Sequence, residues 1–269
     1  MSNDAGALSD FFRELAALRY IPWYRWHPEL ALRYLPMVEY IKHRQTYQKR
    51  PGLSGKGQAL SILEVGSGGL GIVPYLKMPV TGIDVKFEPP FHPKLTMEIG
   101  KAEKLNFADE FFDVVISSDM LEHLPPDIRE KAIFEMIRVA KLGVVIGVPC
   151  GDMAVQHDME LRQEYLKIHK KEFPFLSEQV EYGLPDRADI ITYINRASKK
   201  LDKKIKLLVN GNENMRIRKF LMTGWVSPNF LMNIFFRKIL LLAVPLFRLL
   251  ERPPYYRQLF FVTIENRKQ

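Results

Sequence analysis

A buried strand that runs into a glycine-rich turn is the feature that most constrains the fold of this chain. Residues 61–65 are mainly apolar, and four glycines follow between positions 66 and 71. A second predicted strand, Val80–Asp84, ends in a carboxylate. Glycines at such a turn let a ligand approach the backbone, and an acid at the end of the next strand accepts hydrogen bonds from ribose hydroxyls. The pair therefore predicts an α/β sheet that holds a nucleoside-containing cofactor.

The residue at the centre of the first strand narrows the choice of cofactor. Glu64 lies in an otherwise apolar strand, where a carboxylate is costly unless it has partners. The run Leu63–Gly68 (LEVGSG) resembles the first motif of class I S-adenosylmethionine-dependent methyltransferases, in which an acid occupies the same position. An acid beside exposed turn carbonyls suits the ammonium group of that cofactor better than a pyrophosphate. The sequence contains no Gly-x-x-x-x-Gly-Lys-Ser/Thr, so a phosphate-binding P-loop is not predicted.

A second motif supports the same assignment. Residues 102–125 read AEKLNFADEFFDVVISSDMLEHLP and resemble the AExLPFxDxxFDVVxSxxxLEH region of small-molecule class I methyltransferases. Together with the first motif and a strand predicted over Gly143–Pro149, the resemblance covers about residues 59–148. These motifs are specific for the cofactor and the type of reaction, and they say little about the acceptor.

The resemblance implies where the cofactor binds. The glycine turn would line its methionine end, Asp84 would bind the ribose hydroxyls, and Val85 and Ala102 would meet the adenine. Many members of the family carry an aspartate before that alanine, which contacts the adenine amino group. Lys101 stands at that position here, so Glu103 is the remaining candidate for the contact. Asp119 ends the fourth predicted strand and would face the site of methyl transfer. The predicted cofactor-binding residues are Glu64, Gly66, Ser67, Gly68, Asp84, Val85, Ala102, Glu103, Ser118 and Asp119.

Removal of the acceptor's proton is the task left to the protein, because a sulfonium donor is already activated. His123 follows a carboxylate near the cofactor motifs and is the first candidate base; the alternative is that it packs in the turn before Pro125. Asp119 and His157 are the other predicted catalytic residues. By resemblance to families with an acid-x-x-Glu-His run, these side chains and Glu122 form an alternative metal site, but we assign no metal ligands.

The order of the predicted elements indicates a Rossmann-like, seven-stranded, mostly parallel α/β sheet, the fold of class I methyltransferases. Helices are expected over residues 69–77, 126–141 and 184–200. The segment Lys86–Lys94 contains three prolines and is too short for a normal crossover helix, so none is expected there. The predicted strands are Ser61–Val65, Val80–Asp84, Leu95–Ile99, Phe112–Ser117, Gly143–Pro149, Ile205–Val209 and Gln258–Glu265.

An N-terminal addition precedes the predicted domain. Residues 1–58 are predicted to form a helical cap, aromatic-rich over about residues 8–48, and a Gly/Ser/Pro linker. Residues 59–269 form the predicted methyltransferase domain. We expect the rings of the cap to pack on the core as a lid; the alternative is that they form a wall of the acceptor pocket.

A hydrophobic helical insertion is predicted over residues 215–254, before the last strand. Within it, residues 230–250 approach the length of a transmembrane span, but charged residues, Asn233 and Pro245 interrupt the apolar run. The chain must also return to the sheet afterwards. Two interpretations remain open: a buried helical pair that covers the core, or a membrane-surface element with cations at anionic headgroups.

A third, weaker resemblance concerns the acceptor. Residues 173–185 (FPFLSEQVEYGLP) are similar to the PFLxEHxxYGLP segment of methyltransferases in bacterial polysaccharide gene clusters, although Gln179 replaces the histidine. It implies O-methylation of a saccharide or a lipid-linked glycan, with a catalytic role for Glu178 in doubt. Two alternatives remain: methylation of a quinone precursor or another small aromatic, and a non-catalytic cofactor-binding scaffold in a glycan-assembly complex.

Composition limits partners and location. The net charge of +8 and pI near 9.4 suit nucleic acid, an anionic membrane surface or an acidic substrate. A nucleic-acid substrate is not favoured, because no Asn/Asp-Pro-Pro-Tyr/Phe follows the fourth predicted strand. Cys150 is the only cysteine, which excludes an internal disulfide and suits a reducing compartment. The polar run Met1–Asp10 argues against a signal peptide. We therefore expect a cytoplasmic protein, with peripheral membrane contact through residues 230–250 as one of the two open interpretations, and make no prediction of its oligomeric state.

Overall fold

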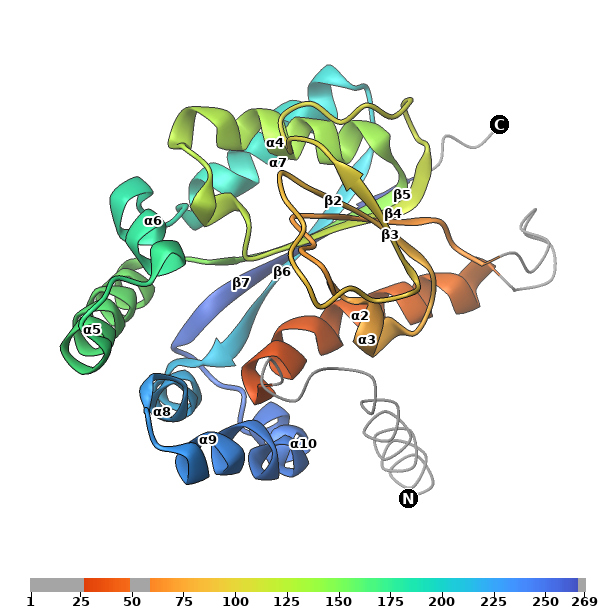
Figure 1. The fold of residues 1–269 in the computed structure, drawn as a ribbon. Coiled ribbons are helices and arrows are strands. Elements are labelled where there is room, and N and C mark those ends of the chain that lie inside the picture. Colours follow the sequence, from red (N-terminus) through yellow and green to blue (C-terminus); the bar gives the residue numbers. More distant parts are fainter. Residues whose placement is uncertain (1–26, 49–58, 266–269) are drawn as a thin grey trace.

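The computed structural model describes residues 27–48 and 59–265, and its centre is a single seven-stranded sheet (Figure 1). The strand order is β3-β2-β1-β4-β5-β7-β6. Strands β1 to β5 are parallel, and β7 is antiparallel to both β5 and β6. The predicted Rossmann-like sheet is therefore confirmed. The strands are β1 (Ile62–Val65), β2 (Val80–Asp84), β3 (Leu95–Ile99), β4 (Phe112–Ser118), β5 (Ala140–Pro149), β6 (Ile205–Asn214) and β7 (Tyr255–Ile264).

The strand order reverses between β1 and β4, and this reversal positions the site. From β1 the chain moves outward to β2 and β3, and it then returns to pair β4 with the other side of β1. At such a switch point the connections leave in opposite directions and open a crevice beyond the carboxyl ends of the strands. The segments that follow β1, β2 and β4 carry the two sequence motifs, so the fold gathers the motifs at one edge of the sheet.

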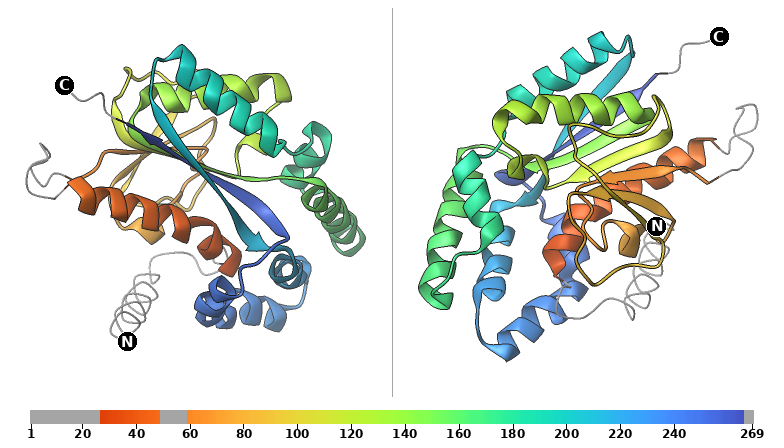
Figure 2. Two further views of the ribbon diagram at one scale, coloured as in Figure 1. Left: turned by 180° about the vertical axis from the view of Figure 1, so that it is seen from behind. Right: turned by 45° about the horizontal axis from the view of Figure 1, so that its top comes forward.

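Helices cover both faces of the sheet (Figure 2). Helices α4 (Pro126–Val139) and α7 (Arg187–Lys200) lie on one face, and α2 (Pro28–Gln48) with the short α3 (Val73–Leu76) lies on the other. Both faces are therefore buried, which is why the central strands are nearly continuous apolar runs. Gly143 of β5 gives α2 room, since a Cβ there would overlap the Tyr40 hydroxyl.

Two predicted helices begin later in the structure than expected. The helix expected over residues 69–77 is reduced to α3, because Gly68 and Gly71 hold the preceding turn at positive φ. The helix expected from residue 184 begins at Arg187, where Asp186 caps it by accepting from the Ala188 N–H at 2.6 Å. As predicted, no helix lies between β2 and β3 in this described part of the chain.

No helix is predicted over residues 151–183, but the structure contains two helices there, α5 (Asp152–His169) and α6 (Pro174–Tyr182). Most of α5 is exposed, and its buried residues are few and partly polar, so the apolar periodicity that marks a helix is weak. Both helices stand beyond the carboxyl ends of the parallel strands (Figure 1). They are therefore placed to build the cavity rather than the core.

The predicted insertion before the last strand is helical. It comprises α8 (Met215–Val226), α9 (Phe230–Arg237), the 3-10 turn η4 (Ile239–Ala243) and α10 (Val244–Leu249). Residues Phe230–Leu249 have the length and the mean hydropathy, 1.9, of a membrane span, but they form three short segments instead of one helix. Of the predicted cap, α2 is described. Residues 1–26 and residues 49–58, which include the predicted linker at 50–58, lie outside the described residues.

Candidate functional site

A cavity of about 990 Å³ lies beyond the carboxyl ends of β1, β2 and β4. Its walls come from α2, the glycine turn, the 3-10 turn η3 (Leu121–His123), α6 and α8. This volume is at the upper end of the range for small-molecule sites. The predicted cofactor-binding residues that line it are Gly66, Ser67, Gly68, Asp84, Val85, Ala102, Glu103 and Asp119.

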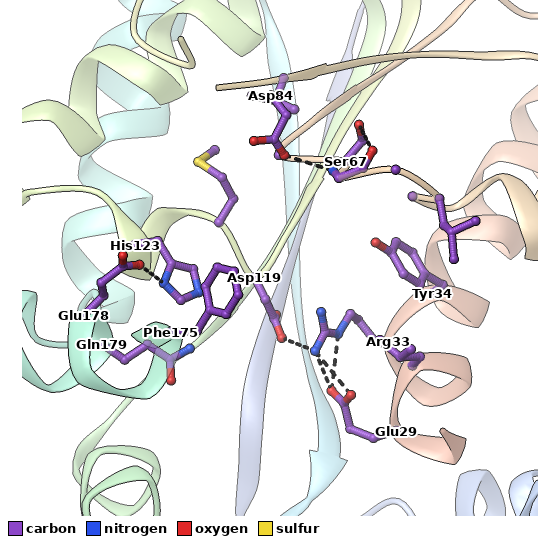
Figure 3. A pocket seen from close by; sticks show the side chains of 18 of the residues that line it. Glu29, Arg33, Tyr34, Ser67, Asp84, Asp119, His123, Phe175, Glu178 and Gln179 are labelled. Carbon is purple, nitrogen blue, oxygen red and sulfur yellow. Dashed lines mark hydrogen bonds and ion pairs between the residues drawn. The ribbon is translucent and has the colours of Figure 1, made fainter. Parts of the chain in front are cut away.

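One side of the cavity suits a nucleoside. The Asp84 carboxylate accepts from the Gly68 N–H at 2.9 Å, so it steadies the turn while it borders the cavity (Figure 3). A Cβ added at Gly68 would meet no atom within 4 Å, which leaves this stretch of backbone open to a ligand. The Val85 side chain is 68% exposed, which is unusual for an apolar residue at a strand end. A carboxylate for ribose hydroxyls and an uncovered apolar side chain for a purine ring therefore lie next to each other.

Glu64 supports the turn from beneath and does not line the cavity. It is fully buried, and its Oε2 accepts from the Ile72 N–H at 2.7 Å. Burial raises the pKa of Glu64 to about 7, although hydrogen bonds from Ile72 and Tyr34 oppose that rise. A Cβ at Gly71 would overlap this carboxylate, so glycine is required there. The predicted contact between Glu64 and the cofactor's ammonium group is therefore corrected to a structural role.

Two other predicted site residues also lie away from the cavity. Ser118 is buried within the end of β4 and does not border the cavity. His157 lies on α5, where its ring meets Tyr256 edge to face at 5.9 Å between centroids. Burial lowers the pKa of His157 to about 3, so it stays neutral. His157 was predicted to be catalytic; because it packs against Tyr256 and does not line the cavity, that assignment is corrected.

Asp119 borders the cavity but is held by two arginines. Its carboxylate accepts two hydrogen bonds from Arg257, each 2.5 Å long, and pairs with Arg33 at 3.0 Å. Burial alone would raise the pKa of Asp119, but the guanidinium groups of Arg257 and Arg33 lower it. A carboxylate with a lowered pKa is a poor proton acceptor at neutral pH. Asp119 is therefore an anchor for the cavity wall, and its predicted catalytic role is corrected.

His123 is the one predicted catalytic histidine that lines the cavity. Its Nδ1 lies 3.1 Å from Oε2 of Glu178, and its ring meets Phe175 edge to face at 5.3 Å (Figure 3). An ionised carboxylate can only accept, so Nδ1 carries the proton and Nε2 keeps a lone pair. Burial lowers the pKa of His123, although Glu178 and Asp119 oppose that change. The ring is therefore neutral at pH 7 and able to accept a proton.

The alternative metal site is not formed. Across residues 27–48 and 59–265, no group of three or more His, Cys, Asp or Glu side chains is arranged to hold a metal ion. Burial raises the pKa of Glu122 well above its usual range, which disfavours the ionised form that a metal ligand needs. The side chains that the sequence brought together as ligands are separated in the fold, with His157 packed on Tyr256 and Asp119 bound to arginines.

The cavity also contains residues that sequence reasoning did not assign. Helix α2 contributes Arg33 and Tyr34, of which Tyr34 stacks on Tyr75 at 5.4 Å. The alternative in which the N-terminal aromatic segment forms a pocket wall therefore describes Tyr34, whereas Tyr40 packs on the core beside Phe261. The insertion contributes Trp225 and Arg237, and α6 contributes Phe175, Glu178 and Gln179.

Comparisons with known proteins agree with this geometry. Residues 63–147 match the family model described as a methyltransferase domain, and no curated protein matches the sequence. The plantazolicin methyltransferase BpumL, solved with S-adenosylhomocysteine, is 13% identical, with a TM-score of 0.51 over 98% of this chain and 91% of that chain. That likeness shows a shared fold.

Two further solved structures are similar at lower scores. Phosphoethanolamine N-methyltransferase 2 from Haemonchus contortus is 16% identical, with a TM-score of 0.46 over 86% of this chain and 53% of that chain. Magnesium protoporphyrin IX methyltransferase from Synechocystis is 12% identical, with a TM-score of 0.45 over 86% and 84%. The family match, not these scores, identifies the central part of the chain as a methyltransferase domain.

Proposed function

We propose that this protein, an S-adenosylmethionine-dependent methyltransferase, methylates a hydroxyl group of a saccharide or lipid-linked glycan. The observation that carries the proposal is the pairing of His123 with Glu178 at the wall of the cofactor cavity. A sugar hydroxyl is a weak nucleophile, and a neutral imidazole beside it accepts the proton as the new bond forms. The carboxylate and the imidazole therefore form a base with its orienting partner.

The cofactor supplies an activated methyl group on a sulfonium, so the residues of the chain bind, orient and deprotonate. Asp84, Val85 and the turn at Gly68 form the nucleoside side of the cavity, as described above. Across from them, His123 accepts the acceptor's proton at Nε2, while Glu178 fixes the tautomer through Nδ1. Figure 3 shows Asp84 and the His123–Glu178 pair on different sides of the cavity, and the acceptor would lie between them.

The acceptor side of the cavity is aromatic and cationic. Phe173, Phe175 and Trp225 line it, and the rings of Phe173 and Trp225 meet edge to face at 5.0 Å. Aromatic faces and edges suit the apolar faces of a sugar ring. Arg237, also in the lining, provides a positive charge for a phosphate or carboxylate on the same acceptor. This combination and the resemblance of residues 173–185 support a charged or lipid-linked saccharide over a quinone precursor.

The test combines acceptor discovery with variants of the proposed base. Extracts depleted of small cofactors are incubated with the protein and S-adenosylmethionine carrying a deuterated methyl group, and labelled products are identified by mass spectrometry. We expect a labelled saccharide whose formation falls about 10²-fold or more in His123→Asn, the range for loss of a general base. Glu178→Gln should be less active than the parent, and its rate should depend differently on pH.

Binding of S-adenosylhomocysteine separates loss of chemistry from loss of the cofactor site. Both variants should bind it as the parent does, because neither residue belongs to the nucleoside side. A labelled aromatic product would replace the saccharide assignment with the quinone-precursor alternative. Normal cofactor binding without any labelled product in extracts that contain glycan intermediates would favour the scaffold alternative.

A further inference from the structure

An apolar stripe runs along the outer side of the insertion. Six large side chains follow one another at intervals of four, four, three, four and three residues. Members that share α9, η4 or α10 are three or four residues apart, the spacing that keeps them on one side of that segment. Their exposed fractions range from 40% to 78%. The stripe comprises Leu231, Phe235, Ile239, Leu242, Leu246 and Leu249.

The fold makes no use of this stripe in the described part of the chain. The opposite side of the same segments is buried, with Phe236, Leu241 and Val244 each 5% exposed or less and packed in the core. Phe236 sits against Gly224 of α8, where a Cβ would overlap its ring. A surface helix normally directs polar residues outward, so a segment that is apolar on both sides marks an interaction surface.

Basic residues outnumber acidic ones around the stripe, although Arg248 pairs with Glu39 at 2.7 Å and Lys219 pairs with Glu160 at 3.0 Å. Residues 214–250 contain six Lys or Arg and no Asp or Glu. Lys238 follows α9 and is exposed, and Arg252 lies exposed just after α10. Apolar side chains flanked by cations are the pattern of elements that lie in the interfacial layer of anionic membranes. The exposed cations Lys238 and Arg252 at this end of the molecule therefore complement the negative charge of anionic lipid headgroups.

We propose that the stripe docks the protein on an anionic lipid surface, with α9, η4 and α10 lying in the interface. These segments are too short to span a bilayer one by one, and β7 follows them directly into the sheet. They form one end of the molecule, well away from the exposed ends of α4 and α7 (Figure 1). Docking through this end leaves both faces of the sheet unchanged.

The docking surface and the cavity share a helix. Arg237 of α9 lines the cavity, while Leu231 and Phe235 of the same helix belong to the stripe. A lipid surface held by the stripe therefore lies next to one wall of the cavity. This arrangement suits an acceptor that stays attached to a lipid, but the docking proposal does not depend on the nature of the acceptor.

The experiment is co-sedimentation of the full chain with vesicles of phosphatidylcholine alone or with 30% phosphatidylserine. The parent should sediment with the anionic vesicles and lose binding as salt is raised. Leu242→Glu combined with Leu249→Glu should weaken the apparent affinity at least about tenfold. Leu208→Glu is the matched control, because Leu208 is 56% exposed on β6, away from the insertion, and it should bind like the parent.

Unchanged thermal unfolding and S-adenosylhomocysteine binding show that each variant is folded. A parent that remains in the supernatant at low salt overturns the proposal. Equal loss of binding in the Leu208 control overturns it as well, because the stripe is then not the contact. A dimer, detected by analytical ultracentrifugation without lipid and abolished by the double variant, assigns the stripe to a second copy of the chain instead. None of these outcomes depends on methyl transfer, so they are separate from the test of the proposed function.

Discussion

Replacing Glu64 by glutamine tests whether the acid of the first motif supports the fold or binds the cofactor. In the structure its carboxyl group is fully buried beneath the glycine turn, and one oxygen accepts from the Ile72 N–H. Glutamine keeps an oxygen for that hydrogen bond and removes the ionisable group. We therefore expect Glu64→Gln to change the pH dependence of stability and to leave cofactor binding nearly unchanged.

The size of the effect follows from the raised pKa. Burial raises the pKa of Glu64 to about 7, from 4.5. Below pH 4.5 the group is protonated in both states; as the pH rises, the unfolded chain releases the proton first, and the folded chain loses stability until it also ionises near pH 7. The full loss is about 3 kcal/mol, of which about 2.5 kcal/mol falls between pH 5 and pH 8. The Glu64→Gln variant has no ionisable group at this position, so its stability does not fall with pH for this reason.

The assay is urea unfolding of the parent and of Glu64→Gln at pH 5 and pH 8 without cofactor, followed by tryptophan fluorescence. Between these pH values, the stability of the variant relative to the parent should rise by about 2.5 kcal/mol. Burial also raises the pKa of other acids, such as Glu213, to about 7. Their contribution to the pH dependence is the same in the parent and the variant, so it cancels in the difference between the two. If the difference in stability between the variant and the parent is the same at pH 5 and pH 8, the inference that Glu64 is buried with a raised pKa is refuted. A fall of about tenfold or more in S-adenosylhomocysteine affinity would refute its purely structural role.

Three further substitutions test the cavity and its support. Asp84→Asn should weaken S-adenosylhomocysteine binding about tenfold or more in calorimetric titration, because it removes the charged acceptor at the end of β2; unchanged affinity would contradict the assigned nucleoside side. Gly71→Ala should lower the free energy of unfolding by about 2 kcal/mol or more, measured by thermal unfolding, because its Cβ overlaps the Glu64 carboxylate at φ +52°. Arg257→Met should cost about 3 kcal/mol or more in urea unfolding, because it leaves the buried Asp119 without its bidentate partner; a cost below about 1 kcal/mol would contradict this account.

The parts of the fold that the sequence predicts are those that depend on local pattern. All seven strands were found, because buried parallel strands are continuous apolar runs bounded by turns. Their ends were less certain: β5 begins at Ala140, three residues before the predicted strand, because α4 passes into it without a loop. Helices α5 and α6 were missed for the opposite reason, since they lie outside the core and need little apolar periodicity.

The site also has a part that local sequence motifs predict and a part that depends on contacts between distant residues. The nucleoside side depends on residues next to the ends of adjacent strands, so motifs read along the chain find Gly68, Asp84 and Val85. The contact between His123 and Glu178, the proposed base and its partner, spans 55 residues of sequence, and the contact between Asp119 and Arg257 spans 138. No local pattern reports such a contact. The motif around Glu178 departs from the resembling segment at Gln179, and it does not report the 3.1 Å contact between Glu178 and His123.

The origin of the cavity walls explains why the two sequence motifs do not predict the chemical class of the acceptor. The cofactor side is built from strand ends of the central sheet, whose positions the fold fixes. The acceptor side comes from two additions: α5 and α6 between β5 and α7, with Glu178 and Phe175, and the insertion between β6 and β7, with Trp225 and Arg237. Both additions leave the sheet beyond the same edge, so they can change without disturbing the strands. The same insertion carries the apolar stripe, so one wall of the cavity and the proposed lipid-docking surface belong to a single segment.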